Sequence, residues 1–170
     1  MSKIQKTNVA RLLDHSKIPY ELIPYEVDET NLAATHVAEQ LGEDISMVFK
    51  TIVLTAGPGK FFVCVVPGDA DVDLKKAAKA AGYKKAELIA MKELLPLTGY
   101  IRGGCSPIGM KKPFPTFFHK TALDFEKIYV SAGVRGLQLK ISPQDLIKNV
   151  GATVEDLIST KSDKNTENEQ

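Results

Sequence analysis

The sequence predicts an α+β domain in which a mixed β-sheet is packed with short helices. Segments with strand-like composition outnumber those with helical spacing, and most follow one another in an order typical of antiparallel pairing. Of the 170 residues, 44% are hydrophobic and 25% are charged, which suits one compact domain with a full core. We therefore expect a single domain over residues 1–158. Residues 159–170 contain no apolar side chain and predict a disordered polar tail.

Helices are predicted where a capping residue precedes apolar positions with helical spacing and a glycine or proline follows. A proline restricts the residue before it to an extended conformation, so the first helix must end before Ile18–Pro19. Ser142–Pro143 combines a hydroxyl cap with proline at the first helical position, which is a strong helix start. The helices are expected after Thr7 or Asn8, at Thr35–Leu41, at Leu74–Ala81 after Asp71 or Asp73, around Met91–Leu95, and from Pro143 to Gly151.

Strands are predicted from runs of β-branched and aromatic residues bounded by turn signals. Gly57-Pro58-Gly59 separates two such runs by a tight turn and predicts a β-hairpin. Pro24 has no amide hydrogen to donate to a ladder, so it places the first strand at a sheet edge. The strands are expected at Tyr20–Tyr25, Val48–Thr55, Lys60–Val66, Ala86–Ile89, Phe114–His119, Ile128–Ser131, Leu137–Ile141 and Thr153–Val154.

A lysine interrupts an apolar face of the predicted strand Val48–Thr55. Alternate side chains of a strand share a face, so Lys50 points the same way as Ile52 and Leu54. Removing an ammonium group from water without a partner costs several kcal/mol. Lys50 therefore either reaches solvent at the end of the strand or faces a pocket that holds an anionic or electron-rich group. The strand by itself leaves both interpretations open.

Two glycine-containing segments can supply backbone amides to such a pocket. Gly103–Gly104 and Ser131–Gly136 allow close approach of the backbone and positive φ. Amides arranged in this way can surround an acyl or phosphate oxygen and stabilise developing negative charge. Two tight turns without a function are the alternative for either segment taken alone. A nucleophilic Cys105 beside His119 is a further alternative, which the sequence by itself does not test.

Several motifs for cofactor or metal chemistry are incomplete, so we expect neither a cofactor nor a metal. Gly104–Gly109 has the first half of a phosphate-binding loop, but Met110 stands where that loop needs lysine. Asp69–Asp73 starts like a calcium-binding loop, but Leu74 replaces its turn glycine. The histidines show no ligand spacing, being His15, His36 and His119.

Composition argues against other classes of function. The net charge of +1 gives no overall positive field of the kind that attracts DNA, so nucleic-acid contacts must come from local clusters. The two cysteines form no CxxC pair, and no apolar run approaches the ~20 residues of a membrane span. The first residues do not have the pattern of a signal peptide. We therefore expect a cytoplasmic protein with reduced thiols and without DNA or membrane partners.

Four motifs occur together in the chain and carry a family resemblance. They are Phe49-Lys50-Thr51, Thr98-Gly99-Tyr100, Gly103-Gly104-x-Ser106-Pro107-x-Gly109 and Tyr129-Val130-Ser131-x-Gly133-x-Arg135-Gly136. In this order and spacing they resemble the YbaK family of aminoacyl-tRNA deacylases, which are relatives of the prolyl-tRNA synthetase editing domain. The resemblance extends from Asn8 to Leu157. It implies a partly closed mixed sheet packed with helices, with the pocket at the end of the sheet.

The resemblance also implies which residues act. Lys50 is expected to place the aminoacyl ester or the terminal ribose-phosphate of tRNA, the Gly103 amide to bind the carbonyl oxygen, and Ser131 to line the site. These three are the expected catalytic residues. The residues expected to shape the pocket or hold the substrate are Tyr25, Thr51, Gly104, Ser106, Gly133 and Arg135. Ala132 and Cys105 depart from the family, at positions that commonly hold glycine and an aliphatic residue.

The branch of the family most similar to this chain removes cysteine from mischarged Cys-tRNA(Pro), which implies trans-editing of that substrate. In this branch the thiol of the substrate attacks its own carbonyl, and the ester bond to tRNA breaks. The sequence shows no obvious triad, metal site or base, in agreement with that route. Two alternatives are a deacylase that removes another small amino acid with water, and a non-catalytic module that binds aminoacyl-tRNA or the synthetase.

Binding of tRNA needs local positive charge. Lysines gather at Lys75–Lys79, at Lys84–Lys85, and at Lys111–Lys112 beside the glycine segment. Each cluster alone is equally consistent with a solvated surface. With so low a net charge we expect weak binding of tRNA(Pro) by the chain itself. The resemblance implies prolyl-tRNA synthetase as a partner that supplies the remaining affinity.

Overall fold

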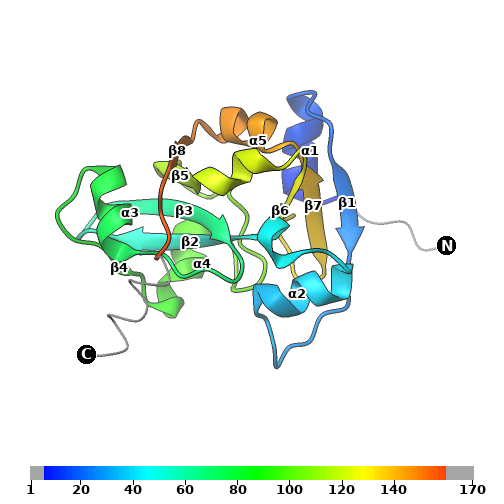
Figure 1. Ribbon diagram of the computed structural model, residues 1–170, viewed down its shortest axis with the longest axis horizontal. Helices are drawn as coiled ribbons and strands as arrows, with labels where there is room; N and C mark the ends of the chain where they lie inside the picture. Colours follow the sequence, from blue (N-terminus) through cyan, green and yellow to red (C-terminus); the bar gives the residue numbers. More distant parts are fainter. Residues whose placement is uncertain (1–5, 160–170) are drawn as a thin grey trace.

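The computed structural model describes residues 6–159, which form an α+β fold (Figure 1). The strands are β1 (Glu21–Pro24), β2 (Phe49–Thr55), β3 (Phe61–Pro67), β4 (Glu87–Leu88), β5 (Thr116–His119), β6 (Ile128–Ser131), β7 (Leu137–Ile141) and β8 (Thr153–Glu155). The helices are α1 (Asn8–His15), α2 (Ala34–Leu41), α3 (Leu74–Ala81), α4 (Leu94–Thr98) and α5 (Pro143–Val150), with 3₁₀ turns η1 (Ile45–Met47), η2 (Met91–Glu93) and η3 (Lys120–Asp124). The fold class is confirmed, and every expected helix and strand is present. None of these helices is long and apolar enough to cross a membrane.

The helices begin where the sequence offers side-chain acceptors. Thr7 caps α1, because its Oγ1 accepts a hydrogen bond from the Ala10 amide at 3.3 Å. The same hydroxyl donates to the carbonyl of Ala132 at 2.7 Å and so fastens α1 to the turn between β6 and β7. Asp73 caps α3 and Ser142 caps α5. The choices that the sequence left open are therefore decided in favour of Thr7 and Asp73.

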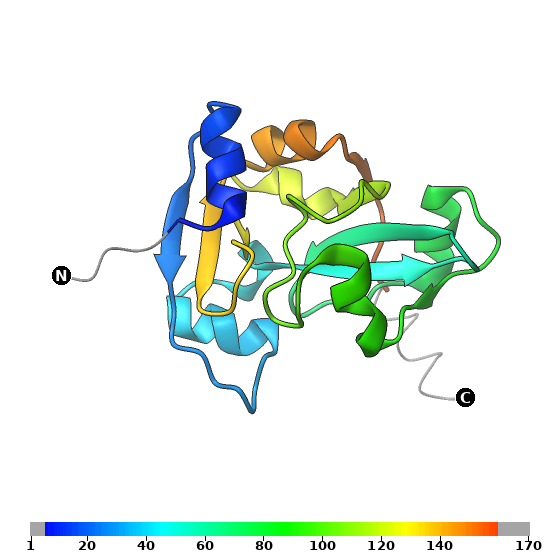
Figure 2. The same ribbon diagram turned by 180° about the vertical axis from the view of Figure 1, so that it is seen from behind.

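The strands form two hydrogen-bonded sheets that meet at one corner. Five strands run in the order β4-β2-β3-β5-β8, and three run in the order β1-β7-β6. Pairing is parallel for β3 with β5 and for β5 with β8, and antiparallel elsewhere. An isolated parallel bridge between Val48 and Tyr129 joins the two sheets. In Figures 1 and 2, α1 and α5 lie above this junction and α2 lies below it. The single mixed sheet that the resemblance implied is therefore divided into two sheets joined at this bridge.

The core occupies both faces of the β2–β3 hairpin. On one face, Phe49 and Val63 belong to a large cluster that includes side chains of α1 and α5. On the other face, Phe62 and Cys64 pack with the alanines of α3. Because β3 is buried on both faces, it is an uninterrupted apolar run rather than an alternating one. Burial also raises the pKa of the Cys64 thiol to about 12, as expected for a small buried apolar residue.

The described part of the chain ends at Ser159, close to the start of α3. The Ser159 amide donates to the carbonyl of Asp71 at 3.1 Å, and only 8% of the residue is exposed. The first residue of the predicted polar tail is therefore packed against the domain. The rest of that tail, residues 160–170, lies outside the described residues.

Candidate active site

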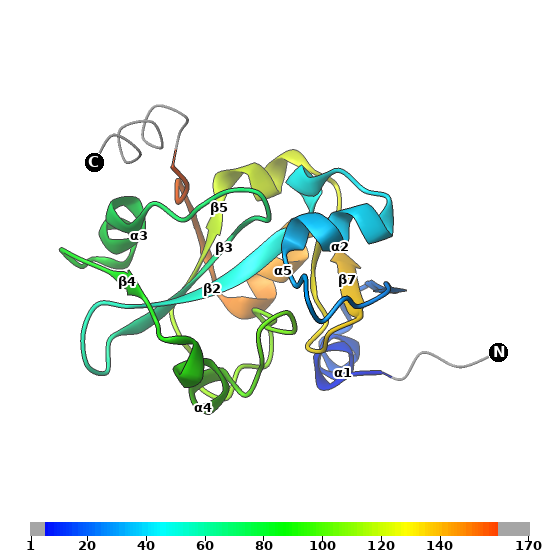
Figure 3. The same ribbon diagram turned by 90° about the horizontal axis from the view of Figure 1, so that it is seen from below.

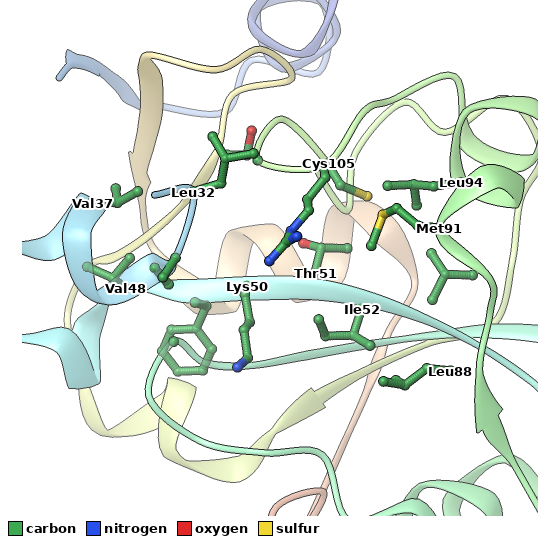
Figure 4. A pocket seen from close by; sticks show the side chains of 18 of the residues that line it. Leu32, Val37, Val48, Lys50, Thr51, Ile52, Leu88, Met91, Leu94 and Cys105 are labelled. Atoms are coloured by element: carbon green, nitrogen blue, oxygen red, sulfur yellow. The ribbon is translucent and has the colours of Figure 1, made fainter. Parts of the chain in front are cut away.

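A pocket of about 500 Å³ opens along one edge of β2. β3 pairs with β2 over its whole length, but β4 pairs with it only at Leu54 and Thr55. Apart from the isolated bridge at Val48, no described strand pairs with β2 on this side at Phe49, Lys50 or Thr51. The space beside it is enclosed by α2, by the segment from β4 to α4, and by the loop that follows α4 (Figures 3 and 4). Incomplete strand pairing thus determines where the pocket lies.

Lys50 and Thr51 enter the pocket from opposite faces of β2. Figure 4 shows Thr51 on the side of Cys105 and Met91, and Lys50 on the other side of the strand, where Leu88 also lies. Both faces contribute because the pocket opens at the strand edge rather than over one face. Lys50 therefore lines a pocket, and its contact with an anionic or electron-rich group there stays a prediction.

Ser131 reaches the same pocket because of the bridge between Val48 and Tyr129. The two chain segments run in the same direction at this bridge, so the residues two positions further along are Lys50 and Ser131. Ser131 also pairs across β6 and β7 with Gln138, which lines the pocket too. Both residues are buried, with exposed fractions of 7% and 5%. Two motifs far apart in the sequence are thus brought into one site.

Within the glycine loop, Gly103 lines the pocket and Gly104 does not. The Gly104 amide donates to the carbonyl of Ile101 at 2.9 Å, so it is not available to a substrate. A Cβ on Gly104 would lie 3.2 Å from backbone atoms of Val134 and Arg135, which explains the need for glycine there. The Gly103 amide donates to no residue in the described part of the chain. Of the two glycines, Gly103 is therefore the one that could contact a bound group, and its role in binding a carbonyl oxygen stays a prediction.

Three other residues that the sequence proposed for the site lie outside the pocket lining. Ser106 is fully buried, and its Oγ accepts a hydrogen bond from the Ile108 amide at 3.3 Å. Tyr25 packs with the cluster of side chains around α2. The Gly133 amide donates to Oγ of Ser131 at 3.1 Å. These residues support the loops and strands around the pocket rather than its inner surface.

Arg135 also lies outside the pocket, but it holds the loop that carries Gly103. Its Nε donates to the carbonyl of Arg102 at 2.8 Å, and its guanidinium forms an ion pair with Glu29 at 2.6 Å. A Cβ on Gly103 would lie 3.3 Å from the Arg135 Nε atom, so the two are in close contact. Arg135 thus connects the Gly103 loop to the segment before α2.

Gln138 and Arg102 also line the pocket, although neither was expected from the sequence. Gln138 Oε1 and Thr51 Oγ1 are buried, and neither has a hydrogen-bond partner among the described residues. Buried polar atoms are usually paired, so unpaired ones in a pocket wall indicate a ligand that completes them. Gln138 alternates with Leu137 and Leu139, as in an ordinary half-exposed strand, so the sequence contains no local signal that distinguishes it.

The described lining of the pocket has positive charge and no acid. Lys50 and Arg102 are its charged residues, and most of the others are apolar. A cation and a free amide beside apolar walls stabilise negative charge that develops on a carbonyl oxygen, and they also attract phosphate. Among the described residues, no three His, Cys, Asp or Glu side chains gather in a way that could hold a metal ion.

Cys105 and His119 do not form a nucleophile–base pair. Cys105 lines the pocket, and burial raises the pKa of its thiol to about 12, so the thiol stays protonated at neutral pH. His119 is on β5 and does not line the pocket. Its Nδ1 accepts a hydrogen bond from the Leu157 amide at 3.1 Å, and burial lowers its pKa. His119 therefore serves the packing of the C-terminal segment.

Comparison with known proteins shows the family to which this chain belongs. The family model described as "Aminoacyl-tRNA editing domain" matches residues 29–149. A protein of Enterococcus faecalis named "Putative Cys-tRNA(Pro)/Cys-tRNA(Cys) deacylase EbsC" is 46% identical over 143 residues, which cover 84% of this chain and 87% of that protein. A proline–tRNA ligase of Trichlorobacter lovleyi is 33% identical over 75 residues, covering 44% of this chain and 13% of the ligase.

A solved structure shows the same fold. It is described as the crystal structure of a "putative trans-editing enzyme for prolyl tRNA synthetase", with a TM-score of 0.76 and 21% identity over 92% of this chain and 100% of that one. The matched family segment includes Lys50, Gly103 and Ser131. The chain belongs to the aminoacyl-tRNA editing domain family, as the YbaK-type motifs predicted, and is an aminoacyl-tRNA deacylase.

Proposed function

We propose that this protein removes cysteine from mischarged Cys-tRNA(Pro), acting in trans. The name of the Enterococcus relative supports this substrate, and the match to a proline–tRNA ligase supports the connection with proline. The observation that carries the proposal is the composition of the pocket. Lys50 and Gly103 line the pocket, but the described lining has no His, Asp or Glu that could activate water.

In this proposal the substrate supplies the nucleophile. The thiolate of the bound cysteinyl group attacks its own ester carbonyl, forming a carbon–sulfur bond and a four-membered thiolactone ring. The bond from the carbonyl carbon to the ribose oxygen then breaks, and that oxygen takes up a proton as free tRNA leaves. Intramolecular groups held in a reactive geometry reach effective concentrations of ~10⁵ M or more. Positioning alone can therefore supply much of the rate.

In this proposal the residues of the pocket stabilise the developing charge and hold the substrate. The Lys50 ammonium and the Gly103 amide stabilise the negative charge that develops on the carbonyl oxygen during the attack. Thr51 and Ser131 present hydroxyl groups to the aminoacyl group or to the terminal ribose. Arg135 acts through Gly103, because it fixes the position of that loop. An amino acid without a thiol can occupy this pocket without being released.

The tRNA is proposed to lie against the lysine clusters of the sequence. The exposed members of these clusters are Lys75, Lys79, Lys84, Lys85, Lys111 and Lys112. Lys76 instead forms an ion pair with Asp156 at 3.2 Å and donates to the Ile158 carbonyl at 2.9 Å. With a net charge of +1, we expect weak binding of tRNA(Pro), strengthened by prolyl-tRNA synthetase as a partner in the cytoplasm.

The test is a deacylation assay on tRNA(Pro) carrying cysteine, alanine or 2-aminobutyrate, with wild-type protein, Lys50→Ala and Lys148→Ala. Lys148 is exposed on α5 and is the control for removal of a lysine. We expect rapid loss of cysteine only, abolished in Lys50→Ala and kept in Lys148→Ala. Rapid loss of 2-aminobutyrate, which has nearly the shape of cysteine but no sulfur, would overturn the thiol route and favour a water-using deacylase. Binding without release of any amino acid would indicate a non-catalytic module.

A further inference from the structure

Gln138 places an unused hydrogen-bond acceptor in the wall of the pocket. The residue is 5% exposed, lines the pocket, and its Oε1 has no partner in the described part of the chain. It lies on β7, the central strand of the three-stranded sheet, between Ile23 on one side and Ser131 on the other. Paired neighbours on both sides fix its backbone, so the side chain has little freedom to turn away. A buried acceptor left unpaired destabilises a fold, and its retention points to a donor on the ligand.

The position of Gln138 indicates which ligand group it meets. Cross-strand pairs share a face, so Gln138 and Ser131 lie on one face of their sheet. The bridge between Val48 and Tyr129 continues this row towards Lys50. Lys50 is placed for the ester carbonyl under the proposed function. The hydrogen-bond donor nearest to that carbonyl on an aminoacyl ester is the α-amino group, one carbon away.

No carboxylate in the described lining competes for that amino group. The charged residues of the pocket wall are Lys50 and Arg102, which repel an ammonium rather than bind it. A neutral side-chain carbonyl accepts a hydrogen bond from an amino group in either protonation state. Gln138 therefore has the chemistry for this contact in a pocket that is otherwise unsuited to an amine.

We infer that Gln138 Oε1 binds the α-amino group of the aminoacyl ester and restricts the site to substrates in which that group is free. This inference rests on the proposed function. It excludes N-acylated esters, such as formylated or peptidyl-tRNA ends. Acylation leaves the nitrogen a single N–H, removes its positive charge, and adds bulk against a wall that is almost completely buried. The added group and the loss of charge both weaken the contact with Gln138.

Binding tests the inference without requiring catalysis. The probes are two RNA minihelices that end in 3′-deoxy-3′-(L-cysteinylamino)adenosine, one with a free amino group and one N-acetylated. The amide linkage is not released by the proposed reaction, so titration calorimetry reports affinity alone. We expect wild-type protein to bind the free amine roughly 10- to 100-fold more tightly, the range for one buried hydrogen bond. Equal affinity for the two probes would overturn the inference.

Variants of Gln138 assign the effect to this residue. Gln138→Leu should bind both probes alike, whereas Gln138→Glu, which keeps an acceptor, should retain the preference for the free amine. Gln144→Leu is the matched control, since Gln144 is an exposed glutamine on α5, and it should behave as wild type. A preference that survives in Gln138→Leu would show that another group binds the amine. The wild-type comparison stands even if Gln138→Leu does not fold, which its melting temperature reports.

The outcome for this inference is separate from that for the proposed function. Release of cysteine from Cys-tRNA(Pro) by the wild-type protein tests the function, and the two minihelices test the amino-group contact. A protein that releases cysteine equally well from Cys-tRNA(Pro) and N-acetyl-Cys-tRNA(Pro), each relative to its uncatalysed rate, would keep the function and lose the inference. A protein that prefers the free-amine probe but releases no cysteine would lose the function and keep the contact.

Discussion

Val48 and Tyr129 form an isolated parallel bridge, and this bridge joins the two sheets of the fold. Both side chains are buried, at 2% and 3% exposure, in the cluster that packs on α2. Two residues beyond each of them, the chain places Lys50 and Ser131 at the pocket. The pocket therefore lies directly beyond the bridge that joins the two sheets. The junction fixes the spacing between the chain segments that carry Lys50 and Ser131.

Lys50→Ala should abolish deacylation while leaving the fold intact. Removal of a cation that stabilises a developing oxyanion typically costs ~10²-fold or more in rate. Lys50 lines a pocket rather than the core, so we expect the free energy of unfolding to change by less than about 1 kcal/mol. Single-turnover rates and urea denaturation measure the two effects. A large fall in stability, absent in Lys148→Ala, would make Lys50 a structural residue instead.

Thr51→Val should lower activity and leave stability unchanged or slightly higher. The Thr51 hydroxyl is buried without a partner in the described part of the chain. Removing it therefore breaks no hydrogen bond within the protein. Valine has nearly the same shape, and we expect a gain of up to about 1 kcal/mol in the free energy of unfolding. Denaturant unfolding measures the change in stability, and the deacylation assay measures the loss of activity.

The control for Thr51 is Thr7→Val. The Thr7 hydroxyl accepts from Ala10 and donates to Ala132, so its loss should destabilise the protein by about 1–2 kcal/mol. If Thr51→Val destabilised the protein as much as Thr7→Val, the Thr51 hydroxyl would have a structural partner, and its assignment to the substrate would be wrong.

The helices and strands could be predicted because their signals are local. Caps such as Asp73 and Ser142, and the turn at Gly57–Gly59, act within a few residues of the chain. The junction between Val48 and Tyr129 and the parallel pairing of β3 with β5 could not, because they join segments far apart and depend on packing of the whole fold.

The site could be predicted only in part, because some of its residues have local signals and others depend on the tertiary structure. Lys50 attracted notice because it interrupts an apolar face, and its motif carried the family resemblance. Gln138 has no such signal, because alternation in β7 places Leu137 and Leu139 on one face and Gln138 on the other, as in an ordinary half-exposed strand. Only the tertiary structure shows that α2 and the sheet junction cover this second face. Gly104 and Arg135 have motif positions but support the pocket from outside.

Arg135→Ala should reduce kcat/KM by roughly 10- to 100-fold, because small displacements of a positioned group are costly in rate. The variant removes the hydrogen bond that holds the Arg102 carbonyl and so loosens the loop of Gly103. Glu29→Gln is the matched control, since the Glu29 side chain is 70% exposed and its loss leaves the bond to Arg102 in place. Equal losses in the two variants would show that the ion pair, not the loop contact, carries the effect.

Cys105→Ser should leave the pH dependence of deacylation unchanged. Burial raises the pKa of the Cys105 thiol to about 12 because it disfavours the charged thiolate. Below that pH the group is a neutral thiol, so it contributes no inflection to the rate between pH 6 and 9.5.

The nucleophile in the proposed route is the substrate thiol, whose unperturbed pKa is ~8.5. The rate should therefore rise tenfold per pH unit below about 8 and level off above it, in wild type and variant alike. Single-turnover rates across this range measure the profile after subtraction of the protein-free rate, because hydroxide also hydrolyses aminoacyl esters. The substrate control is 2-aminobutyryl-tRNA(Pro), whose protein-dependent rate should show no such rise. Loss of the rising limb in Cys105→Ser would instead identify Cys105 as the ionising group and restore an enzyme-borne nucleophile to the mechanism.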